Sequence, residues 1–277
     1  MIEHDKFATK EELFTFLREN KKTILQTKKA EQKNADSVSF FVPVYNEKGD
    51  IVKAEGGELL KKDSIRAKIV INTTNLLDSH MDVHMKGIWK KTVKENPNVL
   101  HLQEHDMKFA SIISDDAKPS VKTMKWSELG LPFDGETEAL IFDSEIKADR
   151  NPFMFEQYAK GYVKQHSVGM RYVNYYLCMN SDSKWDVEEK ANWDKYIGEV
   201  ANAKQAEDYG YFFAVTEAKM IEGSAVVKGS NFATPTLSVK EENNEEPLKN
   251  TLNENKNAAV DIDTVRTALK EVITKNI

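Results

Sequence analysis

The sequence predicts an α+β fold in which strands outnumber helices. Residues 65–72 alternate and are rich in β-branched side chains, which is typical of a strand with one buried face. Other stretches carry the spacing of amphipathic helices instead. With 277 residues the chain is long enough for one sizeable core with appendages. We therefore expect one strand-rich domain with additional segments around it.

Four parts are expected along the chain. They are a helical segment over 1–36, a main domain over 37–237 with a helical insertion at about 181–208, a flexible acidic linker over 238–260, and an amphipathic helix over 261–277. The N-terminal segment places Leu13, Leu17 and other apolar residues at helical spacing among lysines and glutamates. The linker is too polar to bury enough surface to offset the entropy of ordering. The last segment gathers Val265, Leu269 and neighbouring apolar residues on one helical face.

Within the main domain, short apolar runs separated by turn residues predict a succession of strands. A hairpin is expected over 37–57, around a turn at 46–50 that contains Gly49. A helix is expected over 152–160, with Asn151 as its cap and Pro152 at the first helical position, where the missing N–H is harmless. Further strands are expected at 98–101, 109–114, 121–126, 138–146, 162–173, 211–215 and 224–227.

Composition argues against several classes of protein. A net charge of −6 provides no concentrated positive face for nucleic acid. No stretch approaches the roughly 20 apolar residues that span a bilayer, and the N-terminal residues lack the apolar core of a signal peptide. Cys178 is the single cysteine, so an intramolecular disulfide and a cysteine-built zinc site are excluded. We expect a cytoplasmic protein in which Cys178 is a small, half-buried apolar residue.

Ser167 is the candidate nucleophile. It stands in the run Gln165-His166-Ser167-Val168-Gly169, where the glycine leaves open backbone beside the serine. Attack by a serine needs a general base and a third group that orients this base. Adjacent side chains of a strand point to opposite faces, so His166 does not serve Ser167. His105, between a short apolar run and a predicted strand, is the candidate base.

Three separated blocks share a pattern with a known family. They are residues 78–83 with 99–106, residues 161–170, and residues 221–227 with 231–235. In this order and spacing they resemble the "xxHD", "SxGF" and "EvSlV…pAn" motifs of the prohead proteases of tailed phages, which are distantly similar to herpesvirus assemblin. Met170 replaces the usual phenylalanine, Gly223 departs from the third motif, and its early proline is missing. The resemblance covers roughly residues 65–237.

This resemblance implies a fold and a function. The fold is a compact β-barrel core with surrounding helices, and the activity is that of a serine endopeptidase that cleaves scaffold or capsid-protein tails inside the assembling prohead, in the host cytoplasm. It implies Ser167 as nucleophile, His105 as base and Glu222 as the orienting acid. Scaffold and major capsid proteins are the implied substrates, the enzyme can also cleave itself, and no cofactor, metal, nucleic acid or membrane is implied.

Three alternatives stay open. Spacing alone does not separate Glu222 from Glu217, or from Asp106 beside the base, as the third catalytic residue. Residues 101–105 match H-x-x-E-H, a zinc-hydrolase pattern that requires a helix, and His80 with His84 offers further ligands. A non-catalytic capsid-assembly or scaffolding protein would also suit the predicted helical ends and the acidic linker.

Overall fold

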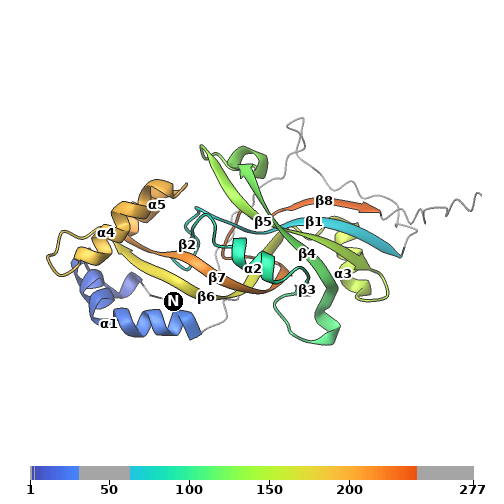
Figure 1. Ribbon diagram of the computed structural model, residues 1–277, viewed down its shortest axis with the longest axis horizontal. Helices are drawn as coiled ribbons and strands as arrows, with labels where there is room; N and C mark the ends of the chain where they lie inside the picture. Colours follow the sequence, from blue (N-terminus) through green and yellow to red (C-terminus); the bar gives the residue numbers. More distant parts are fainter. Residues whose placement is uncertain (1, 3, 31–62, 242–277) are drawn as a thin grey trace, which may run out of the picture. The chain divides into compact units, whose positions relative to one another are not determined.

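A computed structural model describes residues 2, 4–30 and 63–241 of the chain (Figure 1). The predicted hairpin over 37–57, the helix over 261–277 and most of the predicted linker lie outside the described residues. The structure confirms an α+β fold with a mixed sheet of eight strands. None of the helices in the described ranges is both long and apolar enough to cross a membrane.

The elements alternate irregularly along the chain. The strands are β1 (Ser64–Thr73), β2 (Asp82–His84), β3 (Val99–Gln103), β4 (Ile112–Lys125), β5 (Glu136–Lys147), β6 (Gln165–Met179), β7 (Tyr211–Val226) and β8 (Thr236–Glu241). The helices are α1 (Lys10–Ala30), α2 (Lys90–Glu95), α3 (Pro152–Ala159), α4 (Val187–Tyr196) and α5 (Ala203–Tyr209). Short 3₁₀ turns occur at His4–Lys6, Phe109–Ser111, Trp126–Leu129 and Ile197–Glu199.

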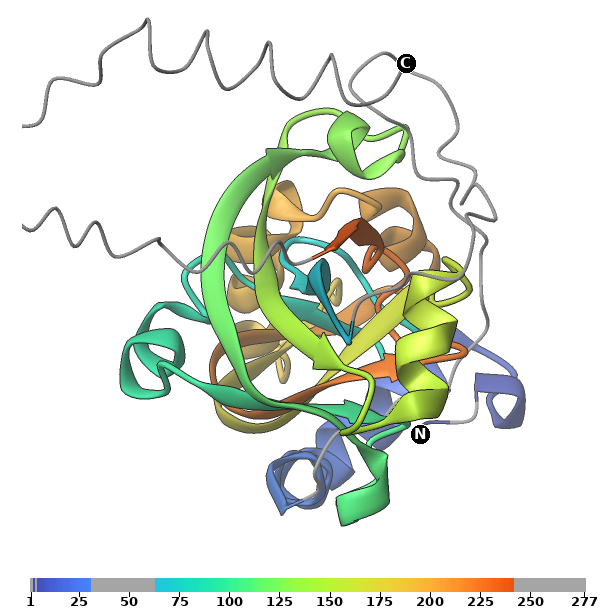
Figure 2. The same cartoon turned by 90° about the vertical axis from the view of Figure 1, so that its right-hand side faces the viewer.

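Strand β7 pairs with three other strands of the sheet, β2, β3 and β6. The order is β2-β7-β3-β4-β5-β1-β8, and β6 pairs with the remaining edge of β7. The β6–β7 and β3–β4 pairs are antiparallel, whereas β3 runs parallel to β7. The curved strands β4 and β5 are visible in Figure 2. This arrangement places the end of β7 between β3 and β6, although the three segments are distant in the sequence.

The sheet is open, so the expectation of a closed barrel is not confirmed. Closure would require β6 to pair with β1 or β8, and in the described part of the chain an isolated bridge between Gln165 and Pro235 stands where that ladder would run. The carbonyl of Pro235 accepts a hydrogen bond from the Val70 amide of β1 at 2.9 Å. In the described residues the contact between β6 and this edge is therefore a single bridge rather than a continuous ladder.

Most predicted elements are confirmed, with shifted boundaries. The alternating segment 65–72 lies in β1, and the insertion contains α4 and α5. The predicted strand at 109–114 is wrong in its first half, since Phe109–Ser111 is a 3₁₀ turn in which the Phe109 side chain is 85% exposed. The two strands predicted at 211–215 and 224–227 are one strand, β7. The predicted boundary between 237 and 238 falls inside β8.

One core cluster lies against the inner face of the sheet. It contains Val168 and Met170 of β6, Met220 of β7 and Phe142 of β5, and Met154 of α3 packs into it. Gly223 of β7 faces this cluster, and a Cβ there would lie 2.5 Å from the Phe142 ring, so the residue that departs from the family motif is required by this packing. A second cluster joins α1 and α4 to the other end of β6 and β7.

Helix α3 begins as its sequence predicts. The Asn151 side chain accepts a hydrogen bond from the Met154 amide at 3.1 Å, and Pro152 occupies the first helical position. Met154 and Tyr158 are the buried residues of this helix. The cap therefore fixes where α3 begins. This helix is the element that precedes β6, the strand that contains Ser167.

Candidate active site

Ser167 lies on the outer face of the β6–β7 ladder. It pairs directly with Ser224 of β7, and the next rung on this face pairs Gly169 with Glu222. Side chains directly opposite each other in an antiparallel pair share a face, so Ser167, Ser224 and Glu222 point the same way. Val168 and Met170 point inward to the core. The side chain of Ser167 is therefore directed away from the core, although the residue is only 7% exposed.

His105 reaches this face through an unusual turn at the end of β3. Glu104 and His105 both adopt left-handed backbone conformations, with φ of 53° and 56°. Such conformations cost non-glycine residues free energy and are concentrated at functional sites. Three contacts hold the turn: the Glu104 amide donates to the Ala225 carbonyl at 2.9 Å, the His105 amide to Ser224 Oγ at 3.1 Å, and the Val227 amide to Glu104 Oε1 at 3.1 Å.

The His105 ring is bound to Glu222. Its Nδ1 lies 2.6 Å from Glu222 Oε1, and both side chains are almost completely buried. Because a carboxylate only accepts hydrogen bonds, Nδ1 is the donor in this contact, and in the neutral ring the lone pair is then on Nε2. Nε2 is buried and has no hydrogen-bond partner among the residues that the structure describes. Orphaned polar atoms of this kind are rare in proteins, and here the orphan is the nitrogen that a general base would use.

Two neighbours hold Glu222 in place. Ser224 Oγ donates to Glu222 Oε2 at 2.6 Å, so both carboxylate oxygens are engaged. The carboxylate passes directly over Gly169, where a Cβ would lie 1.7 Å from Oε1. Ser224 is completely buried, and its hydroxyl both donates to Glu222 and accepts from the His105 amide. Ser224 therefore holds both His105 and Glu222 in place, whereas Ser167 takes part in neither of these two hydrogen bonds.

The other candidates for the third residue lie elsewhere. Glu217 forms hydrogen bonds with Lys91 at 2.8 Å and with Asn174 at 2.7 Å, at positions that are exposed. Asp106 accepts from Ser111 and Lys108, and these contacts hold the pKa of its carboxyl below its ordinary value. Of the three acids left open by spacing, Glu222 is the one that contacts His105.

His166 points into the core, as alternation along the strand predicts. It belongs to a buried chain in which Tyr158 Oη lies 3.0 Å from His101 Nε2 and 2.9 Å from His166 Nε2. The outer ends of the chain are Ser144 and the Thr234 carbonyl. Burial lowers the pKa of His166 to about 4 and that of His101 well below its ordinary range, so both rings are neutral at pH 7. This network is structural.

The H-x-x-E-H pattern does not form a zinc site. His101 lies in strand β3 rather than on a helix, and its ring is 2.9 Å from Ser144 in the interior. His105 instead bonds to Glu222 on the outer face. Because the helix that would place both histidines on one side is absent from residues 101–105, the two rings do not converge.

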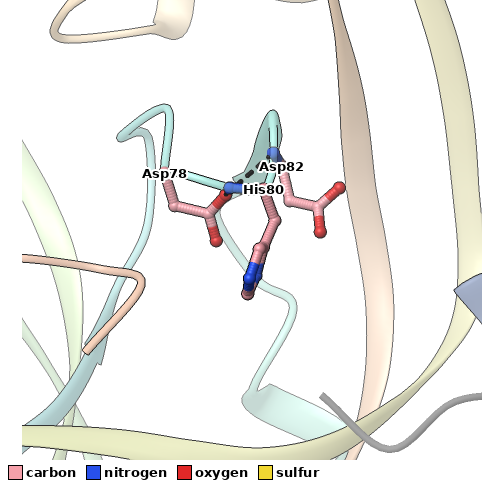
Figure 3. Close-up of side chains that lie close together, drawn as sticks. All are labelled: Asp78, His80 and Asp82. Atoms are coloured by element: carbon pink, nitrogen blue, oxygen red, sulfur yellow. Dashed lines mark hydrogen bonds between the residues drawn. The ribbon is translucent and has the colours of Figure 1, made fainter. Parts of the chain in front are cut away.

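A cluster of possible metal ligands does occur in the loop before β2. Asp78, His80 and Asp82 lie close together, and Asp78 Oδ1 accepts hydrogen bonds from the amides of His80 and Asp82 (Figure 3). Asp82 also binds the Lys28 ammonium of α1 and the Tyr172 hydroxyl at 2.7 Å. A cation is thus already supplied by the chain, and we read this cluster as a structural contact between α1 and the loop.

Ser167 borders a very small cavity. A cavity of about 10 Å³ lies between β1 and β6, and its lining includes Ser167, Asp78, His80 and Asn231. This is room for about one water molecule. His84, the remaining histidine considered as a metal ligand, bonds to Asn72 and Tyr172. A larger opening lies beside the ends of β3 and β7, with Glu104, Gln165 and Val226 among its lining residues.

Sequence reasoning missed the roles of Ser224 and the full role of Gly169. The spacing of these residues could have indicated both roles. Glu222 and Ser224 are two residues apart, as are Ser167 and Gly169, so each pair lies on one face of its strand. Only the register of β6 against β7 shows that these two pairs face each other. Strand β2, of three residues, gave no periodic signal and was also missed.

None of the protein-family models, curated proteins and solved structures with which the chain was compared matches it. The resemblance to prohead proteases therefore stays a proposal. What the fold and site do define is a strand-rich domain that presents a serine beside a buried histidine–carboxylate pair. No hydrogen bond joins the Ser167 hydroxyl to the His105 ring within the described residues. In unliganded enzymes such bonds are often long and tighten only when substrate binds.

Proposed function

We propose that this protein is a serine hydrolase in which Ser167 is the nucleophile, His105 the general base and Glu222 the group that orients the base. More particularly, we propose a serine endopeptidase of the prohead maturation type, acting on scaffold or capsid-protein tails. The observation that carries the first step is the His105–Glu222 hydrogen bond of 2.6 Å, which leaves Nε2 unpaired on the face that carries Ser167.

The proposed reaction is acyl transfer in two stages. His105 Nε2 takes the hydroxyl proton while Ser167 Oγ attacks the peptide carbonyl, and Glu222 stabilises the imidazolium that forms. The same nitrogen then protonates the leaving amine, and the peptide C–N bond breaks to leave an acyl-enzyme. Water, deprotonated by His105, attacks the ester and releases the acid product and free Ser167.

The more particular assignment is supported by order and spacing. The three sequence blocks that resemble prohead protease motifs contain His105, Ser167 and Glu222. In the folded chain Ser167 and Glu222 belong to the paired strands β6 and β7, and His105 lies in the turn after β3, which pairs with β7. The sheet is open in the described residues, so the closed barrel of that family does not count among the observations that support this proposal.

The test is proteolysis measured on purified full-length protein. Wild type, Ser167→Ala and His105→Ala should be incubated with capsid and scaffold proteins from the same genome, and the new termini sequenced. Because nucleophile and base act as a unit, each variant should lose about 10³-fold or more, and the double variant should be little worse. His80→Ala, which alters a histidine that borders the small cavity, is the matched control and should retain activity. Cleavage by Ser167→Ala at the wild-type rate would contradict the proposal.

A further inference from the structure

A groove of about 580 Å³ opens beside the candidate active site, within the size range of ligand sites in proteins. Its walls are α3, the connection from α3 to β6, and the ends of β3 and β7. Figure 2 faces the end of the sheet that carries α3. This opening is referred to below as the α3 groove.

The α3 groove borders the candidate active site. Its lining includes Glu104, which immediately precedes His105, and the paired residues Gln165 and Val226. This pair is the next rung, on the same face, after Ser167 and Ser224. Two residues along a strand span about 7 Å, so the groove begins about 7 Å from Ser167. That is the distance between alternate residues of an extended peptide.

The walls of the groove are mainly apolar. Phe153 is 58% exposed, Tyr162 is 64% exposed and Val227 is 87% exposed, and all three line it. Large apolar side chains gathered around one opening mark a binding surface, whereas scattered ones do not. The carboxylate of Glu104 is already engaged by the Val227 amide. The groove is therefore suited to an apolar side chain, with the exposed Lys164 also among its lining residues.

We propose that the α3 groove binds the substrate peptide in extended form and selects a bulky apolar side chain one or two residues from the scissile bond. The inference rests on the proposed function and names its substrate class. An extended peptide is the occupant because the groove begins one rung from Ser167, at the pair Gln165 and Val226, and alternate side chains of a strand repeat at that spacing. Phe153 and Tyr162 would be the specificity-determining residues.

The experiment is cleavage profiling of a peptide library with the full chain. Wild type should favour leucine, methionine or phenylalanine at one position within two residues of the cut. Phe153→Ala and Tyr162→Ala should each lower kcat/KM for these peptides about tenfold, with little change for peptides that carry alanine at that position. Phe109→Ala is the matched control, since Phe109 is as exposed but does not line the groove. It should leave the profile unchanged.

The outcomes separate the two proposals. Cleavage without an apolar preference, or equal effects of Phe153→Ala and Phe109→Ala, would overturn the groove assignment and leave the protease intact. If wild type cleaves nothing, the protease proposal fails, and the groove is judged by fluorescence anisotropy with Ser167→Ala. Labelled leucine-containing peptides that bind this protein, and bind at least fivefold more weakly after Phe153→Ala, would support the groove. Absence of that difference would overturn it.

Discussion

Replacing Gly169 with alanine should disable the site while leaving the fold in place. The added Cβ would lie 1.7 Å from Glu222 Oε1. Distances under 3.0 Å between a Cβ and a non-bonded heavy atom essentially never occur in proteins. The carboxylate would have to retreat by more than an ångström. The His105–Glu222 hydrogen bond, now 2.6 Å, would then exceed hydrogen-bonding distance.

The expected loss of activity follows from this displacement. Misplacing a catalytic group by about 1 Å costs about 10²-fold in rate, and losing the orienting acid of a serine triad costs about 10⁴-fold. We therefore expect kcat for a cleavable peptide to fall between these limits in Gly169→Ala. The cost in stability should be about 1–3 kcal/mol, as for other overpacked sites. Thermal unfolding followed by circular dichroism checks that the fold remains.

A double-mutant cycle isolates the cause. In Glu222→Ala the clashing carboxylate is gone, so adding Gly169→Ala should have little further effect on kcat or on stability. Gly198→Ala is the matched control, because a Cβ at Gly198 meets nothing within 4 Å. Full activity in Gly169→Ala, or an undiminished effect of that substitution in the Glu222→Ala background, would refute the assignment of Glu222.

Three further predictions concern residues around the site. Ser224→Ala removes the donor to Glu222 Oε2 and the acceptor for the His105 amide, so kcat should fall about 10–100-fold with KM little changed, and a change confined to KM would argue against a positioning role. Burial, with the neighbouring Asp82 as a smaller cause, raises the pKa of Asp78 to about 7, so the folded state keeps a proton that the unfolded state loses above about pH 4. The free energy of unfolding should therefore fall by up to about 1.4 kcal/mol per pKa unit as pH rises from about 4 to 7; Asp78→Asn should lack this component in urea titrations, and equal pH slopes for the two proteins would contradict it. Asn151→Ala removes the cap of α3 and should lower stability by about 1 kcal/mol, and an unchanged midpoint of urea unfolding would show that the cap contributes nothing.

The sequence by itself determined the local elements of this protein. Asn151 and Pro152 mark the start of α3 because a cap and a fixed φ act within one helical turn. The alternation in residues 65–72 marks β1 because side chains of a strand alternate between a buried and a solvated face. The same alternation correctly directed His166 away from Ser167.

Tertiary structure alone decided which acid meets His105. All three candidates are carboxylic acids. The register of β7 against β3 and β6 separates Glu222 from Glu217, and Asp106 instead bonds to Ser111 and Lys108. The barrel expected from resemblance likewise depended on pairing of β6 with β1 or β8, where the described residues form only an isolated bridge between Gln165 and Pro235. At the site this register joins residues that are distant in the chain, such as Ser167 with Ser224 and Gly169 with Glu222, and no local pattern carries that information.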